Sequence, residues 1–132
     1  MRQNGWELGR RWRALADRFG NLLTIANALV LMLASWTPGS YMLRSGIFSG
    51  HVEHMVAYAL SGALMYAVRV GRRAAWQVAA MLSAYAGVLE WGQIFVPGRH
   101  ASFDDFLFGV AGAIAGFLVS AALLKHAHLG GK

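Results

Sequence analysis

Cysteine is absent from this chain of 132 residues, and charged side chains are scarce. The absence of cysteine excludes disulfides and thiolate metal sites. Charged residues make up 14% of the chain, against about 25% in typical soluble domains, while hydrophobic residues make up 57%. This balance argues against an ordinary soluble fold, and the length indicates a single domain.

The apolar residues gather in four stretches, each with the length of a membrane span. A hydrocarbon core of about 30 Å needs roughly 20 apolar residues of helix. Every stretch ends at a helix breaker or a charge, such as Pro38-Gly39 or Pro97-Gly98. We therefore expect an all-α membrane protein, a four-transmembrane-helix bundle whose spans cover about residues 21–36, 51–70, 74–96 and 103–124.

A basic arm precedes this bundle. In it, apolar residues recur at helical spacing with arginines between them, namely Leu8, Trp12, Leu15 and Phe19. That pattern predicts an amphipathic helix lying on the cytoplasmic leaflet. The expected organisation is an arm over residues 1–20, a transmembrane domain over 21–124 and a tail over 125–132.

Lysine and arginine are distributed asymmetrically about the predicted spans. Five lie in the arm, three at the end of the second span and two in the tail, which places ten on one side and only Arg44 and Arg99 on the other. Short segments rich in basic residues stay in the cytoplasm. We therefore expect both termini to be cytoplasmic, in a bacterial inner membrane. Because the basic residues lie mainly on one side of the predicted spans, as membrane topology requires, the net charge of +6 does not indicate nucleic-acid binding.

Small residues follow one face of the last predicted span, at Gly112, Gly116 and Ser120. Small side chains let helix backbones approach closely in lipid. We expect this stripe to hold the bundle together. It does not indicate a homodimer, so the oligomeric state stays open.

Ionisable side chains gather at the outward end of the predicted bundle: Glu53, Glu90, Asp104, Asp105, His51, His54, His100 and Arg99. Glu90 lies six residues before Val96. At about 1.5 Å per residue it sits roughly 9 Å inside the end of its helix. An isolated carboxylate at that depth costs a few kcal/mol. Glu90 is therefore either a functional carboxylate or a structural one, satisfied by Arg99 or by a hydroxyl.

The neighbouring polar residues also allow a structural and a functional interpretation. His54 and Tyr58 share one helix face, either as interfacial groups or as part of a site. Arg99 follows a tight turn and can form an ion pair with a carboxylate or clamp a phosphate.

The run from Ser102 to Asp105 matches a capping box, which explains Asp105 by itself. Asp104 and Asp105 also favour the positive end of the helix dipole. Two successive aspartates exceed what a cap requires, so a role in the site stays open.

Together these motifs resemble the VanZ-like family of bacterial membrane proteins. The resemblance covers roughly residues 50–116 and rests on His54-x-x-x-Tyr58, Glu90-x-x-Gln93-x-x-x-Pro97-Gly98-Arg99, Ser102-x-x-Asp105 and Gly112. The chain departs from the family at Gly50-His51, where Asp-Lys is frequent, and at Gly109, where asparagine is frequent. The family is named after a protein associated with teicoplanin resistance. Its members are small multi-span envelope proteins, some found beside genes for exopolysaccharide or surface-protein handling.

The resemblance and the polar cluster lead to one main hypothesis. The outward end would bind or process an envelope lipid, through its phospholipid head group, or a lipid-linked glycan, in a setting of glycopeptide resistance or exopolysaccharide handling. The candidate catalytic residues are His54, Glu90 and Asp105. The candidate substrate-binding residues are Tyr58, Gln93, Arg99 and Asp104. No metal site is predicted, and the sequence indicates no particular cofactor.

Two other functions use the same residues. A non-catalytic membrane scaffold that modulates envelope enzymes would use the polar cluster as a structural network or a docking surface. A proton-coupled transporter would use Glu90 as its coupling carboxylate. The charges lie toward one leaflet and no inverted repeat is visible, which makes the transporter the weaker alternative.

Overall fold

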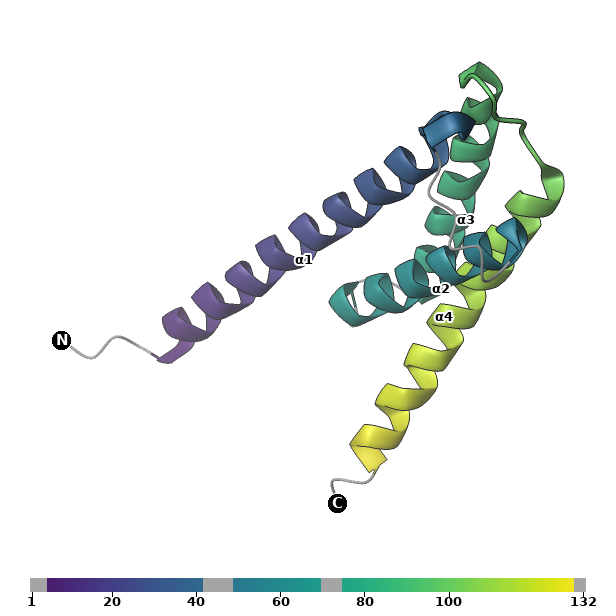
Figure 1. Ribbon diagram of the computed structural model, residues 1–132. Coiled ribbons are helices and arrows are strands. Elements are labelled where there is room, and N and C mark those ends of the chain that lie inside the picture. The colour runs from purple at the N-terminus through teal and green to yellow at the C-terminus, as the bar shows by residue number, and fades with distance from the viewer. Residues whose placement is uncertain (1–4, 42–48, 70–74, 130–132) are drawn as a thin grey trace.

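Four long helices make up most of the computed structural model, which describes residues 5–41, 49–69 and 75–129 (Figure 1). They are α1 (Gly5–Trp36), α2 (Gly50–Arg69), α3 (Ala75–Gly92) and α4 (Phe103–Leu129). Short 3-10 turns follow α1 and α3, namely η1 (Gly39–Tyr41) and η2 (Gln93–Phe95). The regular elements of the described part are thus all helical, as predicted.

Each predicted span coincides with one helix, and the differences lie at the ends. The α1 helix is unbroken, so the predicted arm and first span share one helix that ends at Trp36. The α3 helix ends at Gly92, four residues before the predicted end, because the chain tightens into η2 with Val96 N–H donating to Gln93 O at 3.0 Å. The α4 helix begins at Phe103, as predicted, and continues to Leu129. The predicted boundaries at 70 and 74, and Arg44, Arg72 and Arg73, lie outside the described residues.

Three helical stretches are long and apolar enough to cross a membrane: Gly9–Trp36, Trp76–Phe95 and Phe103–His126. The α2 helix has 20 residues, but Glu53 and two histidines lie in its first two turns. The described part therefore supports three membrane-length helices. A fourth crossing by α2 and the cytoplasmic placement of both termini remain predictions.

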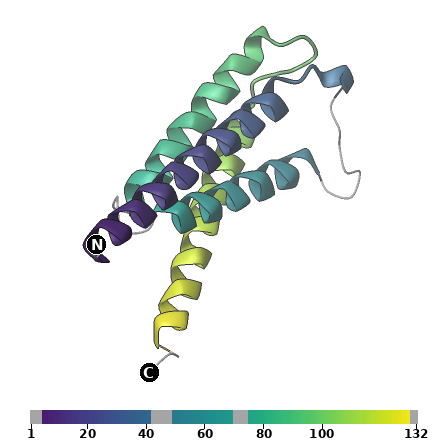
Figure 2. The same ribbon diagram turned by 90° about the vertical axis from the view of Figure 1, so that its left-hand side faces the viewer.

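The helices alternate in direction along the chain. Figures 1 and 2 show the end of α1 beside the end of α3, with the start of α1 and the end of α4 toward the opposite end of the molecule. The α2 helix runs obliquely across α4, against which it packs most extensively. The side chains at the start of α2, the start of α4 and the turn after α3 are thereby brought to one end.

Glycines allow the close crossing of α2 and α4. A Cβ atom at Gly116 would overlap the backbone carbonyl of Ala59, and one at Gly62 would overlap that of Ala113. Gly112 meets the Met55 carbonyl in the same way. The predicted packing role is therefore confirmed for Gly112 and Gly116, because only a residue without a side chain lets the two backbones approach this closely.

The buried apolar side chains form one core between the helices, comprising Leu31, Tyr58, Met65, Val78, Leu82, Ala86, Leu89 and Ala113. Many large apolar side chains are exposed instead, including Phe19 of α1 and Leu123 of α4. An apolar outer surface of this kind fits a lipid environment, where burial in protein gains nothing over burial in acyl chains.

Candidate functional site

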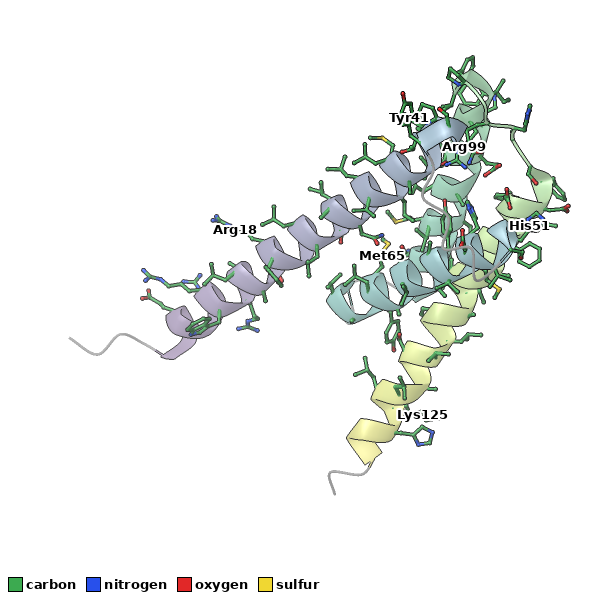
Figure 3. The ribbon with its side chains drawn as sticks, viewed as in Figure 1. Arg18, Tyr41, His51, Met65, Arg99 and Lys125 are labelled. Atoms are coloured by element: carbon green, nitrogen blue, oxygen red, sulfur yellow. The ribbon has the colours of Figure 1, made fainter. Side chains whose placement is uncertain are left out.

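The polar residues lie where α1 and α3 end and where α2 and α4 begin. Figure 3 shows Arg99 and His51 in this region, whereas Arg18 and Lys125 lie toward the other end of the molecule. The segments that meet here are far apart in the chain, so helix packing brings the polar side chains together.

Glu90 is buried and joins α3 to the beginning of α4. Its Oε1 atom accepts the backbone N–H of Ser102 at 2.7 Å, and its Oε2 atom accepts the Gln93 amide at 3.2 Å. Only 6% of the residue is exposed. Both carboxylate oxygens therefore have donors, as a buried charge requires. These donors are an amide and a backbone N–H, whereas the sequence suggested Arg99 or a hydroxyl.

Gln93 extends this connection to α1. Its Nε2 atom also donates to Ser35 Oγ at 3.0 Å, and both residues are buried. Ser35 was not among the predicted site residues. One serine in an apolar helix carries no signal of its own, and its partner lies 58 positions away in the chain.

Arg99 caps the end of α1. Its Nε atom donates to Thr37 O at 3.0 Å and its Nη2 atom donates to Ala34 O at 2.5 Å. The last carbonyls of a helix have no partner within the helix, so these bonds satisfy acceptors that would otherwise face an apolar environment. The turn that carries Arg99 contains Gly98 at φ +72°, a left-handed conformation that favours glycine.

Asp105 pairs with His51, joining the first turns of α4 and α2. The distance from His51 Nδ1 to Asp105 Oδ1 is 2.6 Å, and the His51 ring stacks on Phe108 with centroids 5.2 Å apart. The Asp105 N–H also bonds Ser102 Oγ at 3.3 Å, which confirms Ser102 as the predicted N-cap. The reciprocal bond of a capping box is not made by Asp105, because Glu90 accepts the Ser102 N–H instead.

His54 and Tyr58 form an aromatic pair on α2, with ring centroids 4.9 Å apart. Tyr58 is 2% exposed. Within the part of the chain that the structure describes, neither side chain makes a hydrogen bond, and yet no buried polar side-chain atom is left without a partner. The Tyr58 hydroxyl therefore keeps some accessible surface, and both residues line the same cavity.

Gly109 of α4 lies against the same pair. A Cβ atom there would be 3.3 Å from carbon atoms of both the His54 and the Tyr58 ring. The glycine that departs from the family pattern thus makes room for these two rings.

The cavity has a volume of about 190 Å³ and lies between α1, α2 and the chain that follows α3. Its lining combines aromatic, charged and small residues: Leu31, Ala34, Ser35, Gly50, Glu53, His54, Ala57, Tyr58, Gln93 and Arg99. A second and shallower depression, of about 340 Å³, lies on the other side of Glu90 beside Trp91, Phe103 and Phe106. The first cavity is the better candidate site because hydrogen-bonding and charged groups converge on it.

Some of the predicted site residues line the cavity and the others lie outside its lining. The lining includes His54, Tyr58, Gln93 and Arg99. Outside the lining, Glu90 accepts a hydrogen bond from Gln93, Asp105 pairs with His51, and Asp104 and His100 are exposed near the start of α4.

The charges of Asp105 and Arg99 act on both His54 and Glu90, so these four residues interact electrostatically as one cluster. In the described residues no group of three histidine, aspartate or glutamate side chains is placed to hold a metal ion.

Membrane-length helices with a polar cavity at one end define a small α-helical membrane protein. The VanZ/LLP1 family model matches residues 4–125, so the chain belongs to the VanZ/LLP1 family, as its motifs predicted. No curated protein and no solved structure matches the chain.

Proposed function

We propose that this protein binds the polar head group of a bacterial envelope lipid in the cavity between α1, α2 and the turn after α3. One observation carries the proposal. Tyr58 is almost fully buried and lines the cavity, and its hydroxyl keeps accessible surface without a hydrogen-bond partner in the described part of the chain. A hydroxyl that is accessible and makes no bond within the described protein can donate a hydrogen bond to a ligand atom or accept one from it.

The groups around Tyr58 suit an anionic oxygen. A phenol, an imidazole and a guanidinium supply donors, and Arg99 adds a full positive charge. The cavity lies near the helix ends, at the level where lipid head groups occur. In the predicted topology this is the outer leaflet, where a family setting in glycopeptide resistance or exopolysaccharide handling places the relevant lipids.

Lipid binding is favoured over lipid processing because the Glu90 and Asp105 carboxylates already have partners within the protein. Both oxygens of Glu90 accept hydrogen bonds from the protein, and Asp105 is paired with His51. An acid–base reaction requires a group within reach of the proton that it transfers, and His54 is the candidate that lines the cavity. Processing therefore predicts that Glu90→Gln abolishes cellular function, whereas full function in this variant excludes Glu90 as a catalytic group.

The scaffold alternative is supported by a different observation. The bonds from Ser35 through Gln93 and Glu90 to Ser102 connect α1, α3 and the start of α4. A polar end held together in this way could serve as a docking surface for an envelope enzyme. This alternative predicts partner capture that depends on these bonds and no lipid held by Tyr58.

Native mass spectrometry of the purified protein in mild detergent tests the proposal. We expect the wild type to retain a lipid, and Tyr58→Phe and His54→Ala to lose most of it while keeping the wild-type melting temperature. Tyr66→Phe is the matched control, since Tyr66 lies on the same helix and packs on Phe117 outside the cavity. Equal lipid retention in all three variants contradicts the proposal.

A further inference from the structure

We infer that the first half of α1, residues 5–20, binds anionic phospholipids whose phosphates contact Arg11 and Arg18. This site lies at the end of the molecule opposite the cavity, as the positions of Arg18 and Arg99 in Figure 3 show, so the inference does not rest on the proposed function. Three properties of α1 support it: its length, an exposed apolar stripe on its first half, and two arginines beside that stripe.

The length of α1 carries its first half through the head-group layer of a membrane. The stretch Gly9–Trp36 has 28 residues, which is about 42 Å of helix. A bilayer is about 30 Å thick in its hydrocarbon core and about 40–45 Å thick with its head groups. Arg11 lies 25 residues before Trp36, or about 38 Å along the helix axis. With Trp36 at one surface of the bilayer, Arg11 therefore reaches the phosphates of the opposite leaflet.

One face of this half of α1 is apolar and exposed. Trp12, Leu15 and Phe19 are three and four residues apart and so share a face, on which they are 65%, 54% and 63% exposed. Acyl chains can cover this stripe. Trp12 then lies close to the head groups, the level at which indole rings are enriched in membrane proteins.

Two arginines lie along one edge of this stripe. Arg11 and Arg18 are seven residues apart, about two helical turns, with Ala14 on the same face between them. Both side chains are exposed, and neither makes a hydrogen bond or an ion pair with another residue in the described part of the chain. Helical side chains lean toward the N-terminus, so Arg18 extends from the hydrocarbon boundary toward the level of Arg11. The small side chain of Ala14 leaves room for a phosphate that accepts from both guanidiniums.

The charges favour an anionic phospholipid over a zwitterionic one. Residues 5–20 carry four arginines against Glu7 and Asp17, which gives this half of α1 a net charge of +2. A basic segment at a membrane surface attracts lipids with a net negative charge. A head group that carries its own ammonium has no net charge and is attracted less. In the predicted topology this surface is the cytoplasmic one, where anionic lipids produce a negative potential.

A second copy of the chain fits this face less well. Two copies inserted in the same direction have parallel α1 helices, and residues beside an apolar seam then meet the opposite edge of the partner's seam. That edge consists of Gly9, Ala16 and Leu23. It offers no carboxylate to Arg11 or Arg18, whereas a phospholipid offers each of them a phosphate.

Lipid exchange followed by native mass spectrometry tests the inference. The parent protein carries Tyr58→Phe, so that the donor invoked for the cavity is absent, and is equilibrated with equimolar phosphatidylglycerol and phosphatidylcholine of identical acyl chains. We expect phosphatidylglycerol to be retained preferentially. Replacing Arg11 and Arg18 by glutamine should lower this preference by about fivefold for each arginine, the effect of one basic residue near an anionic surface. The melting temperature should stay the same, because both side chains are exposed.

The matched control also removes two positive charges from this end of the molecule. It combines Arg13→Gln with Lys125→Gln, since the Arg13 Nε atom donates to Gly9 O at 3.3 Å and Lys125 lies on α4. We expect this control to keep most of the preference for phosphatidylglycerol. An equal loss in the control would mean that net charge alone attracts the lipid, which overturns the assignment to Arg11 and Arg18.

The remaining outcomes also decide the inference. Equal retention of the two lipids by the parent protein overturns it, and so does a dimer that Phe19→Ala dissociates, because a second copy would then cover the stripe. If the variant without Arg11 and Arg18 does not fold, exchange of the parent at high salt takes its place. Salt screens exposed charges, so a preference that salt leaves unchanged would contradict a site made of these arginines.

Discussion

The side-chain amide of Gln93 donates to Ser35 Oγ at 3.0 Å, joining the end of α3 to α1 across 58 positions of the chain. The same amide donates to Glu90, whose other oxygen holds the first residue before α4. One amide therefore links α1 to the carboxylate that positions α4, and the cavity is bounded by this arrangement.

Replacing Gln93 by leucine should destabilise the protein. The substitution leaves a buried Glu90 oxygen without its donor, which costs about 1–3 kcal/mol. We expect a lower melting temperature in detergent, measured by scanning fluorimetry. Gln77→Leu is the matched control on α3, since Gln77 lies outside the cavity and outside this set of hydrogen bonds. A Gln93→Leu variant as stable as this control would show that the amide contributes no stability.

Alanine at the α2–α4 crossing should also destabilise the protein. Its Cβ atom at Gly116 or Gly62 would overlap a backbone carbonyl, which cannot move as a flexible side chain does. Such overpacking costs about 1–3 kcal/mol. Gly87→Ala provides the control, because the nearest atom, on Phe106, would lie 3.5 Å away at ordinary contact distance. The helix propensity of alanine should make this control neutral or slightly stabilising. Equal melting temperatures for Gly116→Ala and Gly87→Ala would refute the close crossing.

The indole of Trp36 packs over Gly92, and its Nε1 atom donates to Leu89 O at 3.2 Å. A Cβ atom at Gly92 would lie 2.6 Å from the indole, so Gly92→Ala should lower the melting temperature. In a Trp36→Leu background the same change should have little further effect, because the clashing ring is absent. A double-mutant cycle measures this coupling. Additive effects of the two substitutions would mean that the two residues do not interact.

Gly109→Ala should weaken lipid retention more than it weakens folding. The new methyl group would crowd the rings of His54 and Tyr58, displacing the groups that face the cavity. We expect native mass spectrometry to show less bound lipid at a nearly unchanged melting temperature. Ala111→Ser is a comparison on the exposed face of α4. Undiminished retention in Gly109→Ala would separate the aromatic pair from lipid binding.

Single cysteines test how many helices cross the membrane, since the chain has none of its own. The positions Arg10, Ser40 and Lys125 are exposed in the structure. With four crossings, an impermeant maleimide added to intact cells should label only Ser40→Cys. With three crossings and α2 remaining on one side, Arg10→Cys and Lys125→Cys would lie on opposite sides. Labelling of exactly one terminal cysteine would therefore contradict the four-span prediction.

Helix ends were predicted well where the signal is local. The end of α1 at Trp36 precedes Thr37-Pro38-Gly39, and the start of α4 follows the N-cap Ser102. Both signals act within a few residues of the chain. The end of α3 was predicted too late, because η2 depends on how the chain turns back toward α1, where Gly39 N–H donates to Pro97 O at 3.4 Å.

The sequence by itself determined the class of protein, the four helices and the residues at their polar end, because apolar length, breakers and caps are properties of short segments. Only the tertiary structure decided how those residues are used. It showed that Glu90 and Arg99 make hydrogen bonds between helices, and that Arg99, Tyr58 and His54 line the cavity. The physical reason is that each of these bonds joins segments that only the packing of the helices brings within hydrogen-bonding distance. Ser35 is the clearest case, since its partner Gln93 belongs to a different helix hairpin and nothing near Ser35 in the chain indicates it.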